Sequence, residues 1–124
     1  MQPPTQPRIA VVDADRRVRS SLADVMRVAG AEVVGMAGDV RGALALADGG
    51  ALDAVLLDPR LPDLEAGLAL ISSLRIGWPN IRVVLMGWAD DGESRLDDAG
   101  IAFVSKSAEP EEFLAAALDA CGCH

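Results

Sequence analysis

The chain has 124 residues, 51% of them hydrophobic, which suits one compact domain with a single core and leaves no room for a second. Its net charge of −8, from 19 acidic and 11 basic residues, opposes direct binding to nucleic acid or to an anionic membrane surface. The longest apolar runs are far shorter than the roughly 20 residues needed to span a bilayer, which excludes a membrane protein.

The two ends of the chain contribute little to the expected core. Residues 1–7 (MQPPTQP) are polar and rich in proline, without the pattern of a signal peptide, and we expect a disordered leader before a domain at residues 8–124. Cys121 and Cys123 are too close for ordinary disulfide geometry, and with His124 they offer at most three of the four ligands of a structural zinc site. This use of cysteine indicates a reducing, cytoplasmic location.

Short apolar runs alternate with longer amphipathic stretches, which predicts five repeats of a strand followed by a helix. Near-continuous runs of Val, Ile and Leu are typical of parallel strands that are covered on both faces. The expected strands are Ile9–Val12, Glu32–Met36, Ala54–Leu57, Ile81–Met86 and Ile101–Val104.

A predicted helix follows each strand. The first has an apolar face, an N-cap at Asp15 and a terminal glycine at Gly30. Glycine ends the second, and Trp78-Pro79 stops the third. The fourth carries four acidic residues and few apolar ones, and the fifth starts near Pro110, a residue suited to the first helical turn. The second, third and fourth helices are expected at about residues 40–47, 67–76 and 91–99.

Parallel strands joined by single helices cross over with a right hand, so five such units predict an α/β fold. We expect an open, doubly wound, flavodoxin-like parallel sheet with helices on both faces, in which the ligand crevice lies beyond the carboxyl ends of the strands. The residues at those ends are Asp13, Asp15, Asp58, Gly87, Trp88 and Lys106.

Two or three carboxylates and one lysine are thus expected to converge. Crowded carboxylates need a cation among them, and Mg²⁺ is typically held by one or two carboxylates together with water and phosphate oxygens. A nearby lysine can neutralise a phosphoryl group, which suits phosphoryl transfer to a carboxylate. Helix capping is the favoured role for Asp15. For Asp13, helix capping and a place in the phosphoryl-transfer site are equally favoured. Asp58 precedes Pro59 with no helix close enough to cap.

Three motifs lie at the predicted strand ends: VVDAD (residues 11–15), LLDPRLP (residues 56–62) and FVSK (residues 103–106). Together they resemble the receiver domains of two-component response regulators, and the resemblance covers residues 8–120. The resemblance implies that a histidine kinase or phosphotransfer protein phosphorylates Asp58, with Lys106 assisting and Mg²⁺ bound by Asp13, Asp58 and the acidic cluster. It implies that Phe103 is an aromatic switch residue and that a downstream effector protein is a partner. No enzyme activity is implied beyond the acceptor's own phosphorylation and dephosphorylation.

Several positions depart from the family pattern. Ala14 stands where the family has a second acid, so we expect weak Mg²⁺ binding unless Asp15 compensates. Gly87 replaces the hydroxyl residue that contacts the phosphoryl group, and Trp88 replaces a small residue. Gly67 comes one residue later than the family's glycine, which implies an altered loop. These changes predict phosphorylation of reduced efficiency with an unusual conformational readout.

Two other functions fit parts of the sequence. The same departures suit a pseudo-receiver, a protein-interaction module that works without phosphorylation. The motif DAD also resembles that of haloacid-dehalogenase-type phosphatases, with Asp13 as the nucleophile, although Asp58 then has no role. The cognate kinase, the output, a following effector domain and a homodimer, which is common in the family, are all left open by the sequence.

Overall fold

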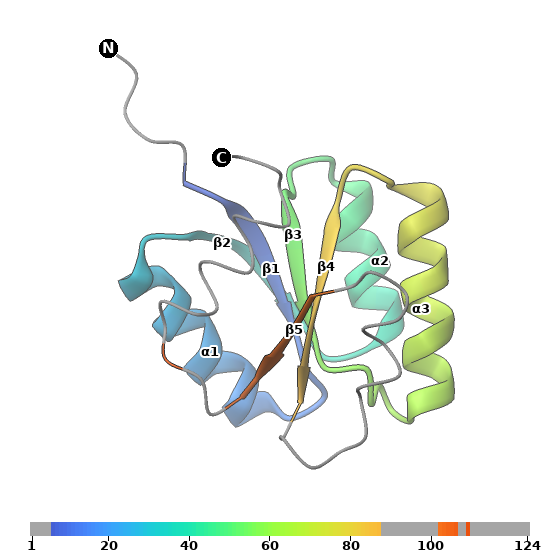
Figure 1. Ribbon diagram of the computed structural model, residues 1–124, viewed down its shortest axis with the longest axis horizontal. Helices are drawn as coiled ribbons and strands as arrows, with labels where there is room; N and C mark the ends of the chain where they lie inside the picture. The colour runs from blue at the N-terminus through green and yellow to red at the C-terminus, as the bar shows by residue number, and fades with distance from the viewer. Residues whose placement is uncertain (1–5, 88–101, 107–108, 110–124) are drawn as a thin grey trace.

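The computed structural model describes residues 6–87, 102–106 and 109, which include a sheet of five parallel strands (Figure 1). Their order in the sheet is β2-β1-β3-β4-β5, so β1 and β3 are neighbours in space although β2 separates them in the sequence. All five predicted strands are confirmed, with ends that shift by one residue at most. The strands are β1 (Arg8–Val12), β2 (Glu32–Ala37), β3 (Ala54–Leu57), β4 (Arg82–Gly87) and β5 (Ala102–Ser105).

Helix α1 (Arg16–Ala29) begins and ends as the sequence predicts. The Asp15 carboxylate accepts hydrogen bonds from the first N–H groups of the helix, those of Arg17 and Val18. Gly30 follows the last helical residue in the left-handed conformation, with φ 107°, which glycine adopts without steric cost. Both ends of α1 are therefore set by local signals.

Helix α2 (Val40–Asp48) agrees with the prediction, whereas α3 (Leu64–Gly77) starts earlier than predicted. The predicted start of the third helix, near Gly67, is wrong by three residues. The Asp63 carboxylate accepts a hydrogen bond from the N–H of Ala66 and so caps a helix that begins at Leu64. The helices predicted at residues 91–99 and from Pro110 lie outside the described residues.

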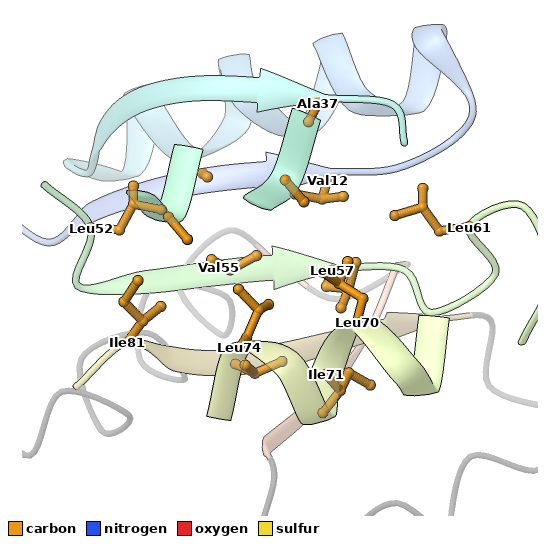
Figure 2. Packing of buried hydrophobic residues seen from close by; sticks show 14 of the residues in the cluster. Val12, Ala37, Leu52, Val55, Leu57, Leu61, Leu70, Ile71, Leu74 and Ile81 are labelled. Carbon is orange, nitrogen blue, oxygen red and sulfur yellow. The ribbon is translucent and has the colours of Figure 1, made fainter. Parts of the chain in front are cut away.

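Side chains alternate between the two faces of the sheet, and helices cover both (Figure 1). α1 covers one face, and α2 and α3 cover the other, as the close view in Figure 2 shows. The predicted doubly wound, flavodoxin-like α/β fold is confirmed. The face under α1 includes Ile9, Val11, Leu56, Val84 and Met86. The face under α2 and α3 includes Ala10, Val12, Val55, Leu57, Val83 and Leu85.

The described chain starts just before β1. Pro7 is buried, and its carbonyl oxygen accepts a hydrogen bond from the N–H of Glu32 at the start of β2. This last residue of the predicted leader is thus in contact with the domain, whereas residues 1–5 lie outside the described part. Across the described residues, no helix combines the length and the apolar character that a membrane crossing requires.

Candidate functional site

Three strands bring Asp13, Asp58 and Lys106 together at the carboxyl edge of the sheet. Asp13 follows β1 and Asp58 follows the neighbouring β3, where the N–H of Asp58 donates to the carbonyl oxygen of Val12 at 3.0 Å. Lys106 follows β5, and its ammonium nitrogen lies 2.8 Å from Oδ2 of Asp13 and 2.5 Å from Oδ2 of Asp58. The side chains are 3%, 11% and 6% exposed, respectively, so water screens these charges weakly.

Every polar group of Asp13 faces a defined neighbour. Its N–H donates to the carbonyl oxygen of Ala37 at 3.1 Å, and its own carbonyl oxygen accepts from Nη1 of Arg19 at 2.9 Å. Oδ1 accepts from the N–H of Asp15 at 2.9 Å. Oδ2 is buried and lies beside the Lys106 ammonium in an ion pair. A carboxylate oxygen has more than one lone pair, so Oδ2 can accept a further contact beside this ion pair.

Asp58 is held by the loop that follows it. Oδ1 accepts a hydrogen bond of 3.0 Å from the N–H of Arg60, a turn that fixes the direction of the carboxylate. The loop then packs tightly against α3, because a Cβ atom added at Gly67 would lie 1.5 Å from the carbonyl oxygen of Pro59. Gly67, predicted as the start of a helix, instead allows this close approach inside the helix.

The electrostatics of the site are set by one ammonium between two carboxylates. Burial of the Lys106 ammonium favours its neutral form, but hydrogen bonds and charge from Asp13 and Asp58 outweigh this effect. The balance raises the pKa of Lys106 above its ordinary value of 10.5. The lysine therefore stays charged at neutral pH, and the three side chains together carry a net negative charge when both carboxylates are ionised.

Asp15 is used differently from Asp13. Its Oδ1 accepts the hydrogen bonds of the two capped N–H groups of α1, and the residue is exposed. The structure thus brings Asp13, Asp58 and Lys106 together and assigns the Asp15 carboxylate to the helix cap. Ala14 is also exposed, so the position of the family's second acid faces solvent.

The two buried carboxylates are donors of the kind that Mg²⁺ uses in proteins. Within the part of the chain that the structure describes, no group of three or more His, Cys, Asp or Glu side chains could hold a metal. Mg²⁺ commonly uses only one or two protein carboxylates, and Oδ2 of Asp13 is a buried acceptor with remaining capacity. Asp13 and Asp58 therefore offer the type of ligand that Mg²⁺ prefers, in the small number that it commonly uses.

The positions predicted as a switch are described in part. Gly87 is the buried last residue of β4, and its carbonyl oxygen accepts a hydrogen bond of 2.9 Å from the N–H of Lys106. Phe103 lies in β5 beside Leu85, but its side chain and the whole of Trp88 fall outside the described residues. Gly87 is thus placed at the same sheet edge as Asp58, and it supplies no hydroxyl group.

Sequence reasoning missed the contacts of Arg19. No spacing distinguishes this arginine from Arg16 and Arg17, which precede it in the same helix. The structure links Arg19 to Gly38, which follows β2 and does not have the positive φ that would by itself favour a glycine. A Cβ atom at Gly38 would lie 2.3 Å from Nη1 of Arg19.

A family model described as the response regulator receiver domain matches residues 9–118. The signal receiver domain of NarL from Mycobacterium tuberculosis is similar, with 25% identity, a TM-score of 0.79, and coverage of 98% of this chain and 100% of that one. A CheY-like receiver domain protein from Methanospirillum hungatei has 24% identity, a TM-score of 0.77 and coverage of 95% of both chains. No curated protein has a sequence that matches this chain. With the family model spanning most of its length, the chain belongs to the response regulator receiver domain family.

Proposed function

We propose that this receiver domain accepts a phosphoryl group on Asp58 from a histidine kinase or a phosphotransfer protein. The observation that carries the proposal is the contact of one buried ammonium, that of Lys106, with the carboxylates of both Asp13 and Asp58. A lysine at this place can balance the charge of an incoming phosphoryl group beside the carboxylate that receives it. Membership of the family favours Asp58 over Asp13 as the nucleophile.

The transfer requires little covalent chemistry from the domain. A carboxylate oxygen of Asp58 attacks the phosphorus of a phosphohistidine, so that a P–O bond forms as the P–N bond breaks. The leaving imidazole keeps the electron pair of the broken bond and takes a proton from water. Lys106 stays protonated because its pKa is raised, and it remains available to the phosphoryl oxygens. A bound Mg²⁺ would supply charge neutralisation, with Asp13 and Asp58 as the residues to hold it.

Reduced efficiency follows from what the site lacks. Ala14 provides no second carboxylate, and Asp15 is occupied as a helix cap. Gly87 offers no hydroxyl to bind a phosphoryl oxygen, so the phosphorylated and free states differ less in their contacts. We further propose a cytoplasmic domain that passes its signal to an effector protein and has no turnover beyond its own phosphorylation and dephosphorylation.

The test is phosphorylation of the purified chain by a small phosphodonor in the presence of Mg²⁺, followed by mass spectrometry. We expect the mass gain of one phosphoryl group, located on Asp58 and lost in Asp58→Asn. The conservative control Asp53→Asn changes a carboxylate of the same kind next to the opposite end of β3 and should still be phosphorylated. A chain that stays unmodified with every donor and at every Mg²⁺ concentration would refute the proposal.

The second candidate is a pseudo-receiver that binds its partner without phosphorylation. Ala14 and Gly87 favour this candidate, since position 14 lacks the family's second acid and position 87 lacks the hydroxyl group that contacts the phosphoryl group. Binding to an isolated partner that is equal for the wild type and Asp58→Asn, with and without phosphodonor, would support the pseudo-receiver. Binding that appears only after phosphorylation would exclude it.

A further inference from the structure

Asp13 sits in a three-residue loop that one side chain of α1 spans. The N–H of Arg19 donates to the carbonyl oxygen of Asp15 at 2.9 Å, as part of the first helical turn. The Nη1 of the same arginine returns to the carbonyl oxygen of Asp13, also at 2.9 Å. Arg19 therefore binds the loop at both ends, through its backbone and through its half-buried side chain.

The Asp13 carboxylate is fixed to that same loop. Its Oδ1 accepts the N–H of Asp15, and the N–H of Asp13 is bound to Ala37 at the end of β2. The carbonyl oxygen that Arg19 holds belongs to the peptide group between residues 13 and 14, and the N–H that Oδ1 accepts belongs to the next peptide group along the loop. The guanidinium group and the Asp13 carboxylate are thus bound to adjacent peptide groups of one short loop, and Oδ2 of that carboxylate faces Lys106.

Gly38 leaves the room that the guanidinium group needs. A Cβ atom at this position would lie 2.3 Å from Nη1 and 3.3 Å from Cζ of Arg19, and all three nearest atoms belong to this one side chain. Because a flexible side chain can move away, alanine fits at Gly38 only if the guanidinium group leaves its place. Such a change removes the contact with Asp13 and keeps the positive charge.

We infer that Arg19 is a positioning residue for Asp13, which orients the carboxylate toward the phosphoacceptor site through the main-chain carbonyl group, and that Gly38 is required for this contact. The inference rests on the proposed function, since orientation of Asp13 matters where Asp13 and Asp58 share a cation. It has particular weight in this chain, because Ala14 leaves Asp13 without the second acid that the family pattern would add.

The experiment compares Arg19→Gln, Gly38→Ala and the double variant with the wild type. Arg16→Gln removes an exposed charge from the same helix, and Gly77→Ala adds a Cβ where no atom lies within 4 Å. Isothermal titration gives the affinity for Mg²⁺, and hydrogen exchange of the Asp15 amide without metal reports the bond to Oδ1 of Asp13. Thermal unfolding of each variant confirms that it is folded.

We expect Arg19→Gln and Gly38→Ala each to weaken Mg²⁺ binding by about tenfold, as loss of a ligand's supporting contact typically does. The Asp15 amide should exchange about tenfold faster in both, because its local opening becomes easier. The double variant should match Arg19→Gln, since the two changes remove one contact. Arg16→Gln and Gly77→Ala should behave as the wild type.

Three results would overturn the inference: an unaltered Gly38→Ala, effects that add in the double variant, or equal effects of Arg19→Gln and Arg16→Gln. The first and third would mean that the position of the guanidinium group has no effect, and additive effects would mean that Arg19 and Gly38 act through different contacts. Failure of the proposed function looks different, because the wild type then gains no phosphoryl group. Amide exchange still decides whether Arg19 orients Asp13, since that measurement needs neither metal nor phosphodonor.

Discussion

The ammonium nitrogen of Lys106 lies 2.5 Å from Oδ2 of Asp58, and both side chains are almost completely buried. Lys106→Met should lower the free energy of unfolding by about 3–5 kcal/mol, because it leaves buried carboxylates without their counter-charge. Urea denaturation measures the loss. The control Arg27→Met breaks the exposed pair with Asp24 and should cost no more than about 1 kcal/mol. Equal losses in the two variants would contradict a buried ion pair.

The same ion pair predicts a loss of stability at alkaline pH. The pKa of Lys106 is raised above 10.5 in the folded state, so its contribution is fully present below that value. It is lost as the pH rises from 10.5 through the higher folded-state pKa, because the unfolded chain then releases the proton more easily. The thermal stability of the wild type, measured as a function of pH, should show this decline. In Lys106→Gln the part of the decline that comes from deprotonation of Lys106 should be absent. Parallel curves for the two proteins would contradict the prediction.

Two glycines of α3 should respond in opposite ways to alanine. Gly67→Ala forces a Cβ atom into the backbone of Pro59, which cannot rotate away, and should destabilise the fold by about 1–3 kcal/mol. Gly77 lies in the same helix, and a Cβ atom added there has no neighbour within 4 Å. Gly77→Ala should therefore leave the free energy of unfolding unchanged or raise it by up to about 1 kcal/mol. Urea denaturation of both variants gives the comparison. Since Pro59 follows Asp58, Gly67→Ala should also slow phosphorylation.

Asp15 should matter for the helix and not for the metal. Asp15→Ala removes the cap of α1 and should cost about 1 kcal/mol in the free energy of unfolding, whereas Asp15→Ser keeps a capping oxygen and most of the stability. Mg²⁺ affinity, measured by isothermal titration, should be nearly the same for Asp15→Ser and the wild type. A large drop in that affinity would show that Asp15 does replace the acid missing at Ala14.

Restoring the family's second acid should strengthen metal binding. Ala14→Asp adds a carboxylate beside Asp13 and should increase Mg²⁺ affinity by about tenfold or more, with lower stability when metal is absent because the acids repel one another. Ser72→Asp adds the same charge at an exposed site of α3 and should change neither property much. An unchanged affinity in Ala14→Asp would mean that position 14 cannot reach the ion.

Local patterns in the sequence determined much of this domain. Apolar runs predicted the strands within one residue, and the expected parallel arrangement of those strands predicted that Asp13, Asp58 and Lys106 lie at one edge of the sheet. The cap at Asp15 and the glycine at Gly30 likewise act on neighbouring residues. Such features are readable from sequence because they depend on side-chain period and on contacts a few residues apart.

Tertiary structure alone decided how the side chains at that edge are used. The path of the loop after Asp58 brings the backbone of Pro59 against Gly67 inside α3. The choice of Arg19 over its neighbouring arginines depends on where the end of β2 puts Gly38 relative to α1. These contacts join separate elements at distances of a few ångströms, and no periodicity of the chain encodes distances of that kind.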